Sequence, residues 1–305
     1  MDMLSPPQGK VDPKSGVEVL ASGSFEAEKA LHERVLKDTK TAQSIDRTVI
    51  AVGRALLLAI ALLIWAYASG RWLDAKSVSD PWSVFSALFD LIATGRLWPQ
   101  LWQTVLEVFA GYTLGATAGI GCALLFALFP NSERIFGPFL LALYSIPKIA
   151  LAPLIVMWFG LGIAPKIILA AMFVFFIVFM NALAGIQSVN RHHVNILRVM
   201  GGTKLMLMTK IILPTMVPFL ILGLRVSIPE AMTGAVIGEF IAASRGLGYL
   251  VYSAANEMNM AVSLAALVVL VFVVAMADFA LGYVEKRLPW QSAGNRLSSH
   301  SIRTR

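Results

Sequence analysis

Four charged residues interrupt the long apolar stretches of this 305-residue sequence: Lys148, Arg225, Glu230 and Glu239. If these stretches cross a membrane, a charge near their middle costs about 2.5–3.5 kcal/mol on insertion scales, so each charge needs a physical reason. In one interpretation the four residues line a polar path for a solute, and the two cations suit an anionic solute. In the other interpretation they form internal ion pairs that only fix the packing of helices. The sequence leaves both interpretations open.

Residues that could catalyse a reaction do not cluster anywhere in the sequence. The one Gly-Lys pair, Gly9-Lys10, is followed by Val11, so there is no phosphate-binding Walker A sequence. His192 and His193 are adjacent, so they do not share one helical face as metal ligands would. We therefore expect no catalytic residue, no metal site and no ATP hydrolysis by this chain.

A basic segment between two apolar stretches carries the most information. Residues 191–214 read RHHVNILRVMGGTKLMLMTKIILP, with four Lys or Arg, no acid and many apolar residues. Two short helices that are broken at Gly201–Gly202 would explain this pattern. Their apolar side chains would fit a groove on a partner protein while the bases stay in water. Alternatively, the segment lies on the surface of an anionic lipid membrane.

The composition indicates which elements must position these residues. Apolar residues make up 57% of the chain and charged residues 14%, and the mean hydropathy is +0.73. Because water-soluble domains carry about 25% charged residues, this composition indicates a membrane protein. The net charge of +7 then reflects basic cytoplasmic loops rather than binding to nucleic acid. We predict an all-α fold with six membrane-spanning helices, near 49–69, 104–129, 136–160, 164–188, 212–242 and 260–283.

The orientation follows from the distribution of Lys and Arg. With both termini on the cytoplasmic side, 17 of the 25 basic residues lie inside and 5 lie outside. This orientation divides the chain into a polar cytoplasmic tail (1–48), a transmembrane domain (49–283) with a cytoplasmic loop (189–211), and a cytoplasmic C-terminal tail (284–305).

Two local patterns predict further structure. Residues 80–95 read as an amphipathic helix on the outer surface, with Asp80 as its N-cap and Pro81 at its first position. Small residues at helical spacing predict close contact with a second helix of the same subunit. These residues are Gly111, Gly115, Gly119 and Gly121.

Several segments resemble the permease subunits of binding-protein-dependent ABC importers. The cytoplasmic signature of that family is EAA, three residues, Gly, nine residues and then I-x-L-P. Here Gly201 stands in register with Ile211-Ile212-Leu213-Pro214, whereas the EAA positions hold Asn195-Ile196-Leu197. Other stretches resemble the nitrate/sulfonate/taurine branch, and the similarity covers roughly residues 78–287. These stretches are 97–128, 143–162, 181–190 and 223–251.

The resemblance implies the fold of a type I importer in a bacterial inner membrane, and a role for the cytoplasmic loop. The loop would be a coupling helix that docks into a cleft on a cytoplasmic ATPase. Gly201 would take a positive φ between the two short helices, and Pro214 would lie in the first turn of the next helix. The residues implied to make the coupling contact are His193, Asn195, Leu197, Met200, Gly201, Gly202, Thr203, Leu213 and Pro214.

The resemblance also implies partners and a class of solute. An ABC ATPase dimer would bind ATP and Mg²⁺, so this chain needs no cofactor of its own. A second permease copy, most simply a homodimer, would share the solute path, and a periplasmic or lipoprotein substrate-binding protein would deliver a sulfonate, taurine, nitrate or a similar solute. Membrane lipid would surround the spans. The alternative function is an ion-gradient-driven secondary transporter, which calls for inverted repeats that the sequence does not show.

Overall fold

The computed structural model describes residues 49–50, 52–71, 78–129 and 132–286. Every regular element within these residues is a helix, which confirms the predicted all-α fold. The predicted tail 1–48 and most of the predicted C-terminal tail lie outside the described residues. The chain forms two units, and the first unit, which ends at Ala68, contributes the helix Val52–Ala68.

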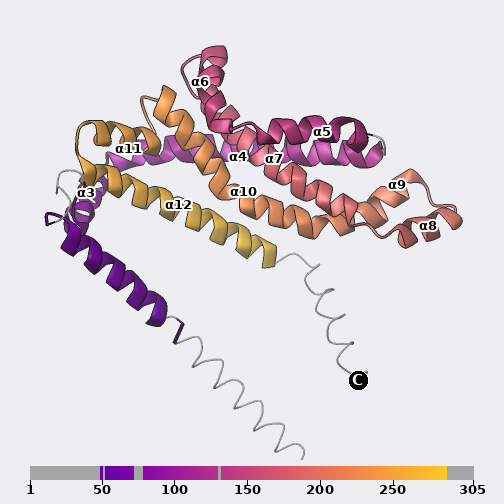
Figure 1. The fold of residues 1–305 in the computed structure, drawn as a ribbon, viewed down its shortest axis with the longest axis horizontal. Coiled ribbons are helices and arrows are strands. Elements are labelled where there is room, and N and C mark those ends of the chain that lie inside the picture. The colour runs from indigo at the N-terminus through magenta and orange to yellow at the C-terminus, as the bar shows by residue number, and fades with distance from the viewer. Residues whose placement is uncertain (1–48, 51, 72–77, 130–131, 287–305) are drawn as a thin grey trace, which may run out of the picture. The chain divides into compact units, whose positions relative to one another are not determined.

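The second unit begins at Ser69 and contains all the labelled helices of Figure 1. The central helix of this unit is α7, which packs against α4 on one side and α10 on another. The elements in chain order are α3 (Pro81–Ala93), α4 (Leu97–Leu128), α5 (Ser132–Ser145), α6 (Lys148–Phe159), α7 (Ala164–Gln187), α8 (Arg191–Val199), α9 (Lys204–Leu207), the π-helix η1 (Met208–Ile212), α10 (Leu213–Ala242), α11 (Leu247–Asn256) and α12 (Met260–Lys286).

Among the residues that the structure describes, four helical segments are long and apolar enough to cross a membrane. They match the predicted second, fourth, fifth and sixth spans, and they are Leu97–Leu128, Ala164–Gln187, Lys204–Ala242 and Met260–Tyr283. The helix Val52–Ala68 is apolar but shorter than these. Helix length and composition therefore support four spans, or up to five if the bent pair described next is counted as one.

The predicted third span, 136–160, is not a straight helix. It consists of α5 and α6, which meet at an angle of 91°. The break falls at Ile146 and Pro147, where the proline lacks the N–H group that an uninterrupted helix would use. The pair is therefore either one broken span or a re-entrant loop.

Small residues allow α4 and α7 to lie close together. A Cβ atom on Gly119 would lie 2.9 Å from the backbone oxygen of Phe175, and Cβ atoms on Gly111 and Gly115 would also collide with α7. The predicted close contact is confirmed for these three glycines. It is wrong for Gly121, which has nothing within 4 Å, because two residues turn the helix by about 200° and point this position away from α7.

The helix predicted at residues 80–95 is confirmed as α3, while its place on the outer surface stays a prediction. Asp80 is its N-cap, because one carboxylate oxygen accepts hydrogen bonds from the N–H groups of Trp82 and Ser83, both at 3.0 Å. The other carboxylate oxygen accepts from the Ser83 hydroxyl. These hydrogen bonds, the Ser83 hydroxyl first among them, lower the pKa of Asp80 below its ordinary value of 3.8.

Candidate functional site

The α8–α9 segment, residues 191–207, lies within the loop that the sequence predicts to be cytoplasmic, and it forms two short helices at one end of the second unit (Figure 1). Asn190 and Thr203 cap α8 and α9 by accepting hydrogen bonds from backbone N–H groups at 2.8 and 3.2 Å. Between the helices Gly201 has a φ of +74°. The predicted break and the predicted positive φ are both confirmed.

The junction between the two helices is held by Leu197 and Gly202. The Gly202 N–H donates to the Leu197 carbonyl oxygen at 2.8 Å. A Cβ atom at position 202 would lie 2.7 Å from that same oxygen, so a glycine is required there. The side chain of Leu197 is half-buried, and it thus supports the junction instead of facing outward.

Large apolar side chains of the α8–α9 segment are exposed, and the described residues do not cover them. Val199 is 89% exposed, Met200 78% and Leu205 72%. His193 and Asn195, which were predicted to contact a partner, are exposed as well. Large apolar side chains gathered on an exposed face mark a surface that binds another protein or a membrane.

Leu213 and Pro214 lie at the start of α10, as predicted, but no loop precedes this helix. The helical run is continuous from Lys204 to Ala242, and the π-helix η1 joins α9 to α10. Pro214 therefore lies in the first turn of α10, but the helical run as a whole begins earlier, at Lys204. The prediction that a helix begins at Pro214 is thus corrected. The π-helix explains this arrangement, since it changes the hydrogen-bond pattern immediately before a residue that has no N–H to donate.

Lys148 is the first residue of α6 and lies next to three aromatic rings. Its Nζ atom is 4.6 Å from the ring centroid of Tyr144, 5.3 Å from that of Phe176 and 5.5 Å from that of Phe173. These distances are within the range of cation–π attraction. Among the described residues no carboxylate pairs with this half-buried side chain, which lies next to the break between α5 and α6.

Arg225 joins α10 to α12 through an ion pair. Its guanidinium donates to the two carboxylate oxygens of Asp278 at 2.8 and 3.1 Å, and Glu285 lies 3.9 Å away. The Arg225 and Asp278 side chains are 48% and 41% exposed, and both border a groove of about 880 Å³ between the two helices. Arg225 therefore fits the ion-pair interpretation while it also faces open space.

Glu230 and Glu239 lie on the same helix in different surroundings. Glu230 is half-buried, and no hydrogen bond or ion pair joins it to another described residue. Glu239 is 1% exposed, and it accepts hydrogen bonds from the Thr104 hydroxyl at 2.6 Å and from the Gly248 N–H at 2.5 Å. The Leu247 N–H donates to the same Thr104 hydroxyl at 2.7 Å, so Glu239 and Thr104 together cap the N-terminus of α11.

A buried ion pair lies close to this cap and was not identified from the sequence. The Lys166 ammonium pairs with a carboxylate oxygen of Glu107, and their side chains are 5% and 0% exposed. The same Glu107 oxygen accepts a hydrogen bond from the Gln103 amide at 2.6 Å. The other Glu107 oxygen is buried and has no hydrogen-bond partner among the described residues. Glu107 lies inside the predicted span 104–129, so the free-energy cost of placing a charge in the membrane could have identified this site from the sequence.

Comparison with known proteins gives matches over most of the chain. Residues 112–289 match the family model described as "Binding-protein-dependent transport system inner membrane component". A "Probable ABC transporter permease protein" of Haemophilus influenzae is 32% identical, with coverage of 64% of this chain and 79% of that one. The "Taurine transport system permease protein TauC" of Escherichia coli is 30% identical, with coverage of 76% and 87%.

A solved structure shares the fold. A chain of the "Crystal structure of an amino acid ABC transporter with histidines" is similar with a TM-score of 0.53 at 18% sequence identity. The similarity covers 65% of this chain and 99% of that chain.

Proposed function

Because the chain belongs to the family of binding-protein-dependent transport system inner membrane components, we propose that its α8–α9 segment receives the movement of a separate ATPase and passes it to the membrane helices. The chain is the permease subunit of an ABC importer, a multi-pass membrane protein that works with an ATPase and a substrate-binding protein. ATP and Mg²⁺ are bound by the ATPase, and both termini of the permease are on the ATPase side of an inner membrane.

One observation carries the coupling role. In the α8–α9 segment the side chains of Val199, Met200 and Leu205 are exposed, and no other described part of the chain covers them. Burying such side chains in a groove on a partner is favourable by about 25 cal/mol per Å² of apolar surface, and the flanking bases remain in water. The proposed contact residues are the exposed residues of the predicted coupling contact, among them His193, Asn195 and Met200. Leu197 and Gly202 keep the junction in shape.

The helices offer a direct mechanical link from this segment to the other side of the membrane. The helical run Lys204–Ala242 has 39 residues, and a straight helix of that length extends about 58 Å. Pro218 and Pro229 lie within it and provide points at which it can bend. Movement of α8 and α9 on the ATPase then changes the tilt of α10 against α7, and this switches the solute path between its two openings.

The solute path lies between two permease copies in this proposal, which also assigns roles to the charges within the spans. Lys148 and Glu230 face the path as unpaired charges, and Arg225 borders it while paired with Asp278. Glu239 stands at its outer end, where its hydrogen bonds hold α11. The solute is a small anion such as a sulfonate, a class suggested by the relative named for taurine transport.

A substitution at Val199 tests the coupling role. Val199→Asp adds a charge to a side chain that is 89% exposed, so the fold is expected to survive and the apolar contact to be lost. We expect co-purification with the ATPase to fall at least tenfold, together with ATP hydrolysis stimulated by the substrate-binding protein. Val199→Leu is the matched control and retains both. Stimulated hydrolysis at the wild-type rate in Val199→Asp would refute the proposed contact.

A further inference from the structure

Two carboxylates and one ammonium are buried together where α7 begins and α10 ends. Glu107, Glu239 and Lys166 are 0%, 1% and 4% exposed, and we refer to them as the buried charge cluster. The Lys166 ammonium pairs with Glu107. Its Cα atom is only 3.0 Å from the place that a Cβ atom on Gly238 would take, so Lys166 lies against the residue before Glu239. The two carboxylates are within hydrogen-bonding distance of each other.

The charges of the buried charge cluster do not balance when all three groups are ionised. One ammonium then faces two carboxylates, which leaves one negative charge in excess. A charge that is buried without compensation is so unfavourable that the group neutralises by binding or releasing a proton. Two carboxylates at hydrogen-bonding distance also repel each other, which favours the state in which one of them is protonated.

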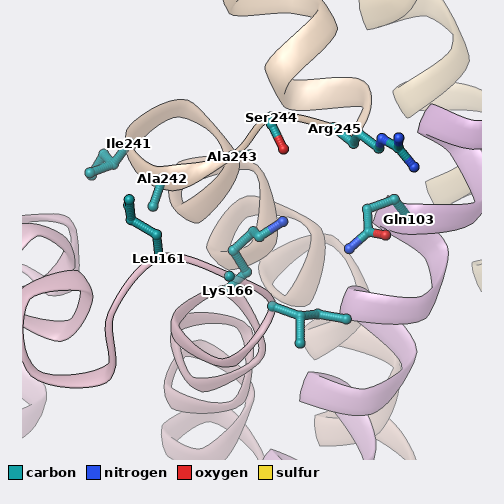
Figure 2. Close-up of a pocket in the computed structure, with 10 residues that line it drawn as sticks. Gln103, Leu161, Lys166, Ile241, Ala242, Ala243, Ser244 and Arg245 are labelled. Carbon is teal, nitrogen blue, oxygen red and sulfur yellow. The ribbon is translucent and has the colours of Figure 1, made fainter.

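Arg245 does not supply the missing positive charge. It lines a cleft of about 500 Å³ together with Lys166 and Gln103. Figure 2 shows its guanidinium directed away from the Lys166 and Gln103 side chains. Arg245 is exposed, and among the described residues no ion pair joins it to Glu239. Since water and salt screen an exposed charge, the buried charge cluster keeps its excess negative charge.

The hydrogen bonds of the two carboxylates leave one oxygen without a donor. The Lys166 ammonium and the Gln103 amide both bind the Oε1 atom of Glu107. Glu239 accepts two hydrogen bonds, from a hydroxyl of α4 at 2.6 Å and from an N–H group of α11 at 2.5 Å. The Oε2 atom of Glu107 is buried and has no hydrogen-bond partner among the described residues. A proton on either carboxylate provides the missing donor, because a protonated carboxyl group donates one hydrogen bond.

Two rival explanations leave both carboxylates ionised. A water molecule beside the Oε2 atom of Glu107 would satisfy that atom but would bring no charge. A metal ion would bring the charge, but hard cations are bound by several oxygens, and the Lys166 ammonium beside the same carboxylate would repel it. The start of α11 stabilises Glu239 by its partial positive charge, yet it gives no donor to the unpartnered oxygen of Glu107. A proton meets both requirements.

We infer that Glu107 and Glu239 hold one proton between them, which makes the buried charge cluster a proton-binding site within the permease. The proton leaves the cluster neutral, and it links α4 to α10 by a hydrogen bond between a carboxyl group and a carboxylate. Together with the hydrogen bonds of Thr104 and Gly248, this bond joins α4, α7, α10 and α11 in one network. The inference goes beyond the proposed function, since it depends neither on the ATPase nor on the solute.

Infrared spectroscopy of the full chain tests this inference, because the C=O stretching band of a protonated carboxyl group is separate from the bands of a carboxylate. The chain is purified in a maltoside detergent, which has no ester group that absorbs in the same region. Spectra are recorded near neutral pH with and without ¹³C-labelled glutamate. We expect a band of protonated glutamate in the wild type that shifts on labelling. Glu239→Gln and Glu107→Gln are each expected to abolish this band, since the remaining carboxylate then has the Lys166 charge to itself.

Glu230→Gln is the matched control variant, since Glu230 is a half-buried glutamate of α10 outside the buried charge cluster. It is expected to keep the band. A wild-type spectrum without protonated glutamate would overturn the inference and would favour a water molecule or a metal ion beside Glu107. Persistence of the wild-type band in Glu239→Gln or Glu107→Gln would overturn it as well, because the proton would then lie elsewhere. The labelled wild-type spectrum remains a test if a variant fails to fold, and it is independent of the Val199 experiment.

Discussion

The two ends of α7 and α10 differ in how much of their structure one chain provides. At the end where α7 begins and α10 ends, Lys166, Glu107 and Glu239 are buried, and an ion pair and hydrogen bonds hold them in place. At the other end α8 and α9 make few contacts with the rest of the chain, and their largest apolar side chains are exposed. One end is therefore packed within the chain, and the other has apolar side chains that no described residue covers.

This difference is what an importer driven from one side requires. A buried ion pair tolerates little displacement, because separating the charges leaves each of them desolvated. An exposed apolar surface binds and releases a partner without that cost. We expect the helices to move as rigid units about the Glu107–Lys166 ion pair and the Glu239 hydrogen bonds. The driving movement is then applied at the α8–α9 segment.

Loss of the Lys166 charge is the largest expected disruption of the packed end. In Lys166→Met the Glu107 carboxylate stays buried without a counter-charge, which costs about 3–5 kcal/mol. We expect the thermal midpoint of the permease in detergent to fall by about 10 °C. A thiol-reactive dye measures it at a single site, since Cys122 is the one cysteine of the chain.

The control for Lys166→Met is Lys148→Met. Lys148 contacts aromatic rings and no carboxylate among the described residues, so its removal is expected to cost about 1 kcal/mol. Equal shifts in the two variants would mean that the Glu107–Lys166 pair contributes no special stability, and the contrast between the two ends would then lose its electrostatic basis.

Two glycines of α4 provide a second test of the packed region. In Gly115→Ala the added methyl group would collide with the backbone of α7, and we expect a loss of about 1–3 kcal/mol. In Gly121→Ala the methyl group meets nothing within 4 Å, and the helix is expected to gain about 0.5–1 kcal/mol. The same dye assay measures both variants. A loss of stability in Gly121→Ala similar to that in Gly115→Ala would contradict the helix contact described here.

The smallest expected effect concerns the cap of α3. The lowered pKa of Asp80 means that its capping is present above about pH 4 and is lost as the pH falls through the folded-state pKa. Asp80→Ala should therefore increase hydrogen exchange of the α3 amides about threefold at pH 7, and much less at pH 2.5. Asp80→Asn keeps a capping oxygen and is the control. An Asp80→Ala effect of the same size at both pH values would show that the carboxylate is not the stabilising group.

Local patterns in the sequence predicted local structure well. Asp80 and Pro81 marked the start of α3, and Gly201–Gly202 marked the junction of α8 and α9. Capping and positive φ depend on residues within a few positions of one another, so these features are readable without a fold. The π-helix before Pro214 was missed, because a proline is compatible with both a helix start and an adjusted helix interior.

The sequence could not predict which residues far apart in the chain form pairs. Arg225 was recognised as a charge needing a reason, but Asp278 as its partner follows only from the packing of α10 on α12. Lys166 was counted among the outer basic residues, and its burial against Glu107 depends on how α4 and α7 meet. Glu239 was likewise recognised as a charge within a span, but its hydrogen bonds to Thr104 and to the start of α11 follow only from the packing of α4 and α11 on α10.

The sequence by itself determined that this chain is an α-helical membrane protein with one segment that is both basic and apolar, because composition, periodicity and charge distribution act along the chain. The tertiary structure alone decided which charges are paired and which glycines touch a neighbour. The reason is that the energy of a buried charge is set by the distance to its counter-charge across the fold, and spacing along one helix does not encode that distance.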